Sequence, residues 1–380
     1  MILQSIEYSQ FDDTPRQWKL ENCTFGKVNL LVGENATGKS KTLNIIKVLA
    51  NLIAGDIKLT FMNGNYTVSF ENDKKPEKYH LKYVDSLVVE EQLDIGTKHM
   101  LSRGEGGKGK IHFEILKQKV DFQTPQNELA VFARRDSLQH PFLDRLYQWG
   151  KAARHYYFGS LLGKDHLAIF QKAEEKQEIN FKDTNSVVGI FKKGDQERPS
   201  EFKKIIMDDM KFIGYDLDDI FLTRPRSFVI IGAPGEVNCL GVKEKDLNDI
   251  TDQQDMSQGM FRCLSLLIQI NYALISGVPS CILIDDIGEG LDYERSSSLV
   301  KLLLEKAKAK SVQLIMATND RFVMNSVPLE YWSIVRRIGG ITQVYNYRNC
   351  PDLFKEFQLT GLSNFDLFST KFYLKDNGRN

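Results

Sequence analysis

The chain has 380 residues, and its 50 lysines and arginines balance 50 aspartates and glutamates, giving a formal net charge of zero at pH 7. This length allows a large buried core and two or three structural units. A neutral total argues against a global positive field for nucleic acid, although a local basic strip stays open. Nowhere do about 18 apolar residues run uninterrupted, which argues against a membrane-spanning helix.

The cysteines favour a reducing compartment. They are odd in number, scattered and never spaced C-x-x-C, which fits free thiols better than a disulfide framework or a zinc site. Cys263 and Cys281 lie in apolar runs and are expected to be small core residues. The N-terminus carries no basic leader. We therefore expect a soluble cytoplasmic protein without a membrane partner.

The first third of the chain predicts strands around one amphipathic helix. Residues 18–25 and 27–33 are typical of short strands, and residues 38–55 of a helix that Gly55 ends. Polar turns separate four further expected strands. These are residues 57–64, 66–72, 79–84 and 110–116.

The middle of the chain is mixed, and its last third alternates helix with strand. Helical stretches are expected at 140–163 and 200–217, and a strand at 227–233. Alternation from residue 257 onwards predicts a parallel sheet with crossover helices. Its elements are a helix at 258–276, a strand at 280–286, a helix at 293–309, a strand at 312–318 and a hairpin at 331–348.

The segment GENATGKS, residues 33–40, fits the G-x-x-x-x-G-K-[ST] pattern of a loop that binds nucleotide phosphates. A strand precedes it and a helix follows it, as the pattern requires. Lys39 is expected to reach the β and γ phosphates, and Ser40 to hold Mg²⁺. Backbone N–H groups and the helix N-terminus supply the other contacts. The predicted nucleotide contacts are Gly33, Glu34, Asn35, Ala36, Thr37, Gly38, Lys39, Ser40 and Lys41.

Four later elements accompany this loop. In CILIDDIGEGLD an apolar strand runs into Asp285 and Asp286, so both carboxylates are expected at its carboxyl end, beside the phosphates. Ser257 can cap the long helix and leave the first N–H groups at Gln258 and Gly259 free for a second phosphate contact. Gly290-Leu291-Asp292 closely follows the acidic pair, and a further strand ends at Thr318 and Asn319.

In this order the five elements resemble the motif set of ABC-type ATPases, and TFGKVNLLVGENATGKS is similar to their RecF/SMC/OLD-like branch, often labelled AAA family ATPase. The resemblance covers both ends of the chain and covers the middle poorly. It implies an α/β fold: a P-loop NTPase with an ABC-type head. That head combines a mixed or parallel sheet core and an antiparallel β subdomain with an inserted α-helical lid.

The resemblance also implies roles, with ATP and Mg²⁺ as cofactors. Asp285 and Ser40 would hold the metal, while Asp286, Lys39 and Asn319 would form the catalytic set. Ser257, Gln258 and Gly259 would contact the γ-phosphate bound by a partner copy, and Asp292 would contact that copy. A Mg²⁺-sensing glutamine is expected between the loop and the signature helix, where Gln92 and Gln123 both fall and neither is favoured.

Three positions depart from the family pattern, and two of them, Asp286 and Asn319, predict slow hydrolysis. The signature reads Met-Ser-Gln-Gly-Met. Asp286 stands where glutamate is usual, about 1.5 Å shorter, and a general base must lie within hydrogen-bond reach of its water. Asn319 replaces histidine and cannot carry a positive charge. Glu289 is an alternative carboxylate for the base.

The domains are expected at 1–124, an ATPase lobe with the phosphate loop and the β subdomain; 125–226, a helical insertion; 227–350, the second ATPase lobe; and 351–380, an aromatic-rich tail. The tail is expected to pack on the core, and docking to a partner is the alternative. The histidines lack metal spacing, and His80, His112 and His155 are expected on strand or helix surfaces.

The gap of roughly 220 residues between phosphate loop and signature, without a sustained heptad repeat, excludes a long coiled-coil clamp. We also expect no TOPRIM nuclease domain. The favoured function is an ATP-sandwiched homodimer acting as a nucleotide-gated switch for a separate effector protein, in bacterial anti-phage defence. A RecF-like DNA-repair or DNA-loading ATPase is the alternative, and a scaffold that binds ATP without hydrolysing it is a third.

Overall fold

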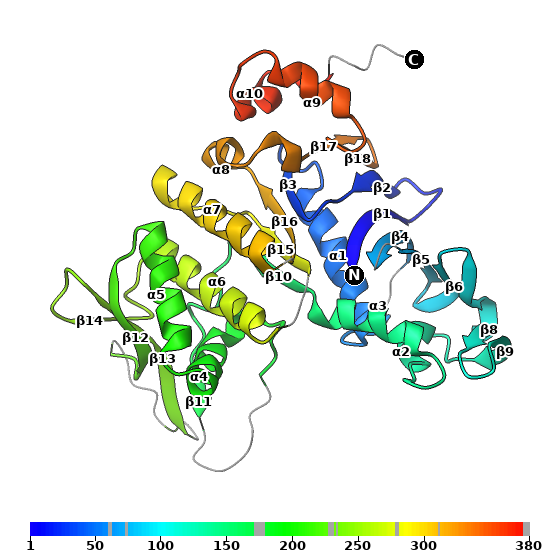
Figure 1. The fold of residues 1–380 in the computed structure, drawn as a ribbon, viewed down its shortest axis with the longest axis horizontal. Coiled ribbons are helices and arrows are strands. Elements are labelled where there is room, and N and C mark those ends of the chain that lie inside the picture. Colours follow the sequence, from blue (N-terminus) through cyan, green and yellow to red (C-terminus); the bar gives the residue numbers. More distant parts are fainter. Residues whose placement is uncertain are drawn as a thin grey trace.

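The computed structural model describes residues 1–59, 63–72, 75–170, 179–226, 232, 235–277, 281–310 and 312–374. Figure 1 shows a central sheet with a helical lobe on one side and a β lobe on the other. The predicted strand at 227–233 falls almost entirely outside the described residues. Within the described residues, no helix combines the length and the hydropathy that crossing a bilayer requires.

Five parallel strands form the centre of the molecule, in the order β10, β15, β16, β3 and β17. The strands β3, β15 and β16 are buried along their whole length, as expected for a parallel sheet covered on both faces. The bounds are β10 Arg154–Tyr157, β15 Cys281–Asp285, β16 Gln313–Thr318, β3 Val28–Val32 and β17 Trp332–Ile338.

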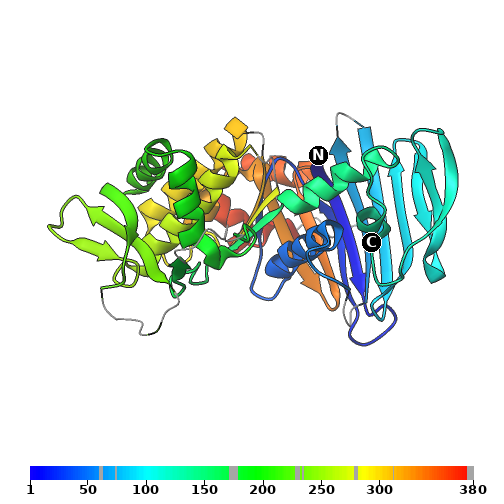
Figure 2. The same ribbon diagram turned by 90° about the horizontal axis from the view of Figure 1, so that it is seen from below.

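The sheet continues beyond β17 into the β lobe, so that fourteen strands of the described chain follow one another. In the sheet order β1, β4, β5, β6, β7, β8 and β9, every pairing is antiparallel. Figure 2 shows this part of the sheet at the opposite end of the molecule from the helical lobe. The bounds are β18 Ile341–Asn346, β2 Trp18–Thr24, β1 Ile2–Gln10, β4 Gly64–Asn72, β5 Lys75–Val84, β6 Leu87–Ile95, β7 Lys98–Arg103, β8 Lys108–Phe113 and β9 Gln118–Gln123.

Helices cover both faces of the central sheet. The remaining described elements are α1 Lys39–Ala54, α2 Ala130–Ala133, α3 Pro141–Ala152, α4 Val187–Glu197, α5 Glu201–Ile213, α6 Gln258–Ile275, α7 Tyr293–Lys310, α8 Arg321–Ser326, α9 Pro351–Gln358 and α10 Asn364–Ser369. Short 3₁₀ helices lie at Glu105–Gly107, Thr184–Ser186, Leu329–Tyr331 and Phe372–Leu374, and a second sheet contains β11 Ala168–Phe170, β12 Leu217–Thr223, β13 Glu236–Glu244 and β14 Ile250–Asp252.

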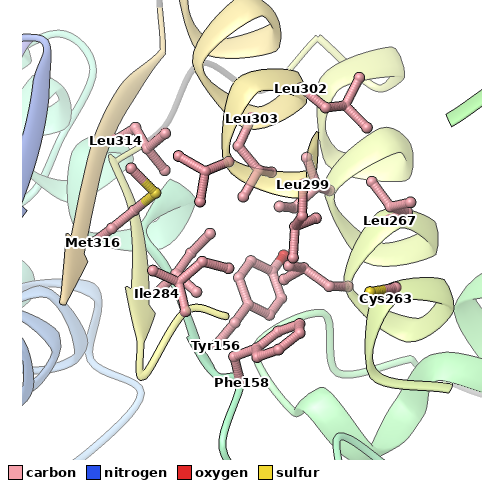
Figure 3. Packing of buried hydrophobic residues seen from close by; sticks show 14 of the residues in the cluster. Tyr156, Phe158, Cys263, Leu267, Ile284, Leu299, Leu302, Leu303, Leu314 and Met316 are labelled. Carbon is pink, nitrogen blue, oxygen red and sulfur yellow. The ribbon is translucent and has the colours of Figure 1, made fainter. Parts of the chain in front are cut away.

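Alternate side chains of the central strands belong to two different cores. Ile282 and Ile284 of β15 face the core that contains α6 and α7, whereas Leu283 faces the core that contains α1 and α3. Figure 3 shows the first of these, where Leu267 and Leu299 approach the sheet from the two helices. The central region is therefore a helix–sheet–helix sandwich. The predicted parallel core and antiparallel subdomain are both present.

Two predictions about elements are corrected here. The helix expected at 140–163 ends at Ala152, because Arg154–Tyr157 pair with β15 as strand β10. The strand expected at 57–64 is absent at Ile57–Leu59, which follow the end of α1, and residues 60–62 lie outside the described chain.

The segment 125–226, expected as one helical insertion, contains two groups of helices that pack on opposite faces of the sheet. Helices α2 and α3 pack with α1, while α4 and α5 pack against α6. Strand β10 separates the two groups along the chain.

The aromatic C-terminal segment packs on the core, as expected, and this weakens the docking alternative. Phe354 and Phe357 are buried, and Leu367, Phe372 and Tyr373 join the same hydrophobic core as α6 and α7. The expectation that Cys263 and Cys281 are core residues is also confirmed.

Candidate functional site

The phosphate loop connects β3 to α1 in a conformation that needs glycine at two positions. Gly38 has φ +110°, in the left-handed region, and a Cβ at Gly33 would lie 2.5 Å from the carbonyl oxygen of Val335. The loop is therefore held between its own helix and the β17–β18 hairpin. The side chain of Lys41 lies 3.8 Å above the ring of Trp18.

Lys39 points back into its own loop. Its ammonium donates to the carbonyl oxygens of Gly33 at 2.7 Å and Glu34 at 3.0 Å, and the residue is only 6% exposed. Burial lowers the pKa of Lys39, and the nearby Asp286 and Asp285 carboxylates oppose that shift. A cation enclosed by a loop of this kind is suited to a phosphate anion.

The acidic pair lies at the carboxyl end of β15, as expected. Asp285 is buried, and burial raises the pKa of its carboxyl, while the adjacent Ser40 hydroxyl opposes the increase. A hydroxyl and a carboxylate at one point are oxygen ligands of the kind that Mg²⁺ takes. These two residues thus fit the predicted metal role.

Asp286 and Glu289 face the same short loop. Asp286 is half-buried with φ +52°, and Glu289 is exposed. A Cβ built on Gly159 would lie 2.5 Å from Oε2 of Glu289 and 3.3 Å from Oδ2 of Asp286. Both carboxylates therefore remain candidates on geometry, and their neighbour is the loop that follows β10.

Strand β10 brings Tyr157 to this site, which the sequence analysis missed. Tyr157 pairs in register with Asp285, and the next residue, Phe158, donates its N–H to the Asp285 carbonyl at 2.9 Å. The Asp286 carboxylate raises the pKa of the Tyr157 phenol. The only signal was a run of β-forming residues, His-Tyr-Tyr-Phe, before Gly-Ser, hidden at the end of a helical pattern.

Neither candidate glutamine is at the site. Gln92 lies on β6 and Gln123 on β9, seven and ten strands from β3 in the sheet. Both belong to the antiparallel lobe because the chain builds that lobe before it returns to the core at β10. The hypothesis that one of them senses Mg²⁺ is therefore wrong.

Asn319 follows β16, the strand between β15 and β3, and is exposed. The preceding Thr318 is buried and donates to the carbonyl of Ile287, and the following Asp320 caps α8. The structure thus brings Lys39, Ser40, Asp285, Asp286 and Asn319 to the carboxyl edge of three adjacent strands.

Ser257 caps α6 and lies on the surface. Its hydroxyl accepts the N–H of Met260 at 3.3 Å, and both Ser257 and Gln258 are exposed. Gly259 packs against the turn after the acidic pair, where its Cβ would lie 3.0 Å from Leu291 and 3.3 Å from the carbonyl of Gly290. The start of α6 is therefore open to solvent and beside the acidic turn.

Arg262, one turn into α6, joins the helical lobe to the site. The largely buried guanidinium donates to the carbonyls of Ser160 at 2.8 Å, Gly159 at 2.7 Å and Glu289 at 3.0 Å. Asp292 caps α7 by accepting the N–H of Arg295 at 2.9 Å, and its side chain also pairs with that arginine. Asp292 is exposed, as a contact to another copy requires.

A parallel sheet whose carboxyl edge carries a phosphate loop, an acidic pair and a nearby open helix start defines a P-loop ATPase with an ABC-type head. The sequence matches, over residues 28–325, the family described as "AAA domain, putative AbiEii toxin, Type IV TA system", and the chain belongs to that family. A search of the curated proteins finds no match.

Two solved structures share the fold. An Smc head bound to the C-winged helix domain of ScpA is 13% identical, with a TM-score of 0.52, covering 91% of this chain and 97% of that one. The Smc head from Pyrococcus furiosus, with an extended coiled coil and bound to the C-terminal domain of ScpA, is 10% identical, with a TM-score of 0.50, covering 94% and 99%. At these identities the likeness concerns the fold alone, and it confirms the predicted fold of an ABC-type head.

Proposed function

We propose that this protein is a nucleotide-gated switch: an ATPase whose copies close head-to-tail around ATP and Mg²⁺ and thereby control a partner protein. The observation that carries the proposal is the exposed, serine-capped start of α6 beside the turn Gly290–Asp292. A helix start with free N–H groups binds anions. Because it is open to solvent, it is available to a phosphate held by another copy.

Each residue of the site then has a role. Lys39 would exchange its loop carbonyls for phosphate oxygens, and Ser40 and Asp285 would hold the metal. Bound Mg²⁺ would neutralise phosphate charge. Asp286 would orient the attacking water, and Asn319 would hydrogen-bond the γ-phosphate without adding charge. The closed dimer is favoured because only there are both sets of contacts made.

We further propose slow hydrolysis and a long-lived closed state. Asp286 is one methylene shorter than the usual glutamate, and Asn319 is uncharged, so both changes weaken catalysis more than binding. The family description names a putative toxin and a toxin–antitoxin system, which supports a role in a system of paired proteins. Control of a separate effector in anti-phage defence is the role that we propose within it. The Smc heads bound to ScpA domains support the idea that this fold offers a surface to partner proteins.

The test is complementation between two inactive variants. Lys39→Ala removes the phosphate ligand of one site, and Ser257→Arg blocks the helix start, so each variant alone should neither dimerise with ATP nor hydrolyse it. Mixed in equal amounts, they form heterodimers with one intact composite site. Because neither variant forms homodimers and each heterodimer has one intact site of two, about one half of the wild-type single-turnover activity should return.

Light scattering with ATP provides the second measurement, because the wild-type mass should rise from 43.5 kDa to about twice that value in the closed C₂ dimer. Ser257→Ala, which loses only the cap, should lie between the wild type and Ser257→Arg. If the mixture stays inactive while both variants remain folded, the site does not form between copies, and the proposal fails.

A further inference from the structure

A small cavity lies two turns along α1 from the phosphate loop. Its volume is about 30 Å³, and its polar lining is Lys47, Asn51, Arg154, His155 and Lys182, with Leu283 and two alanines behind them. Lys47 comes eight residues after Lys39 on α1, which corresponds to about 12 Å along the helix axis. The cavity is at the amino end of β10, whereas the nucleotide site is at the carboxyl end of the central strands.

The cavity has more positive than negative charge. Lys182 pairs with Asp56 at 2.7 Å, and Lys151 uses the other oxygen of the same carboxylate at 3.0 Å. Within the described part of the chain, Arg154 donates to the backbone carbonyls of Lys151 and Ala153. Among the described residues, neither Arg154 nor Lys47 has an acidic partner within 4.0 Å. The region therefore has four cationic side chains, Lys47, Lys151, Arg154 and Lys182, and one carboxylate, Asp56, which pairs with two of them.

His155 adds an unpaired nitrogen to this cluster. Its Nε2 atom is enclosed and has no hydrogen-bond partner within the described part of the chain. Burial, and then the charge of Lys47, lowers the pKa of His155 to about 4. The expectation that this histidine lies on a strand surface is met only in part, because His155 lies on β10 but is partly buried. Burial also lowers the pKa of the Arg154 guanidinium.

Desolvated cations and an enclosed nitrogen without a partner are costly, and such groups are ordinarily paired. An anion in the cavity would accept from Arg154 and Lys47 and would lie beside the His155 ring. The volume exceeds the 10–15 Å³ or so that one water requires, so one or two anion oxygens can enter while the rest stays at the mouth. Lys47, which is exposed, lines the mouth.

From this arrangement we propose that the cavity between α1 and β10 is a binding site for a phosphate group, separate from the nucleotide site. A guanidinium, an ammonium and an imidazole from two elements converge on it, and such mixed sets of donors suit phosphate oxygens. The proposal does not depend on the switch function, since it involves neither Lys39 nor the acidic pair.

The experiment follows the imidazole of His155 by NMR in histidine-labelled protein. It uses the Lys39→Ala background, so that the phosphate loop does not compete for the ligand, and His155→Gln assigns the signal. Millimolar inorganic phosphate should raise the pKa of His155 by more than one unit, in a saturable manner. The groups that face this imidazole are Lys47, Arg154, Lys182, Lys151 and Asp56.

Lys47→Ala should weaken phosphate binding by about tenfold, the loss expected for one charged hydrogen bond, without changing the fold. Lys301→Ala, which removes an exposed lysine of α7, is the matched control and should leave the affinity unchanged. Arg154→Met tests the half-buried donor and should weaken binding at least as much as Lys47→Ala.

A short DNA duplex in place of phosphate identifies the source of the group. A shift of the His155 signal with the duplex means that nucleic-acid phosphates reach the cavity, and a shift with phosphate alone means a small phosphorylated molecule; either supports the site. No saturable shift with either ligand overturns the proposal. So does an ordinary pKa for His155 in phosphate-free protein, because the cavity would then already be neutralised.

Discussion

Three carboxylates lie at the end of β15 and in the turn after it, and their different surroundings indicate different roles. Asp285 is buried beside Ser40 and Lys39, Asp286 is half-buried in a left-handed conformation beside Tyr157, and Glu289 is exposed. A residue that orients water needs a fixed side chain, and partial burial restricts Asp286 more than Glu289.

We therefore expect Asp286→Asn to lower the single-turnover hydrolysis rate by about 10²-fold or more, the usual contribution of a general base, while ATP binding is kept. Glu289→Gln should change the rate by less than about threefold, since an exposed side chain of this kind contributes little to orienting the water. Rapid-quench measurement with saturating ATP distinguishes the two. A larger loss of rate in Glu289→Gln than in Asp286→Asn would identify Glu289 as the general base.

His155 predicts a loss of stability in acid. Its pKa is about 4 in the folded protein and 6.5 ordinarily, so the unfolded chain binds more protons between these values. Stability from this group is complete above pH 6.5 and is lost as the pH falls towards 4, by about 3 kcal/mol in total.

Urea unfolding across this range, in phosphate-free buffer, measures the slope. His155→Gln should flatten it, whereas His166→Gln, which removes a half-exposed histidine elsewhere, should leave it unchanged. An identical slope in the His155→Gln protein would show that other groups cause the acid sensitivity.

At the scale of elements, one arginine ties the helical lobe to the catalytic edge. Arg262 of α6 holds the loop after β10 and the turn after β15, so a movement of α6 is transmitted to both. Because α6 is capped by Ser257, Arg262 links the surface proposed to meet a second copy to the turn that contains Glu289.

Arg262→Ala should destabilise the protein by about 3 kcal/mol, because three carbonyls lose a charged donor. Arg262→Lys keeps the charge but loses the planar fork, so it should recover only part of the stability. Urea unfolding gives the free energy, and ATP-dependent light scattering gives the coupling. Arg16→Ala, at an exposed arginine, is the control. An unchanged free energy of unfolding in Arg262→Ala would contradict the proposal that this arginine links the helical lobe to the site.

At the scale of the whole molecule, the central sheet separates two hydrophobic cores, and the last described residues return to the phosphate loop. Lys371 pairs with Glu34 at 2.9 Å, so the C-terminal segment reaches the second residue of that loop. Both side chains are more than half exposed, and such a pair adds little stability. The buried side chains of α9 and α10 hold this segment in place.

This organisation predicts how hydrogen exchange is distributed. Amides of β3, β15 and β16, covered on both faces, should exchange only through global unfolding. Amides of β9, the last strand of the sheet with one unpaired edge, should exchange by local opening and much faster. Mass spectrometry of exchanged peptides measures both. Equal protection of β9 and β15 would mean that the β lobe and the core unfold as one unit.

Local patterns in the sequence were sufficient to predict most residues of the nucleotide site. The phosphate loop, the acidic strand end and the serine cap are each set by a few neighbouring residues whose types and spacing have a direct physical meaning. Helix α1 and its end at Gly55, helix α6 and the β17–β18 hairpin were predictable for the same reason, since periodicity and turn residues act locally.

The tertiary structure alone decided which distant segments meet. Strand β10 has four residues and follows a helix without a break in pattern, so only its pairing with β15 makes it a strand and brings Tyr157 to Asp286. Gln92 and Gln123 lie in the right interval of the chain and in the wrong lobe. The Arg262 contacts and the charged cavity at His155 join residues more than a hundred positions apart. No local rule records such contacts, because they depend on how the sheet orders its strands.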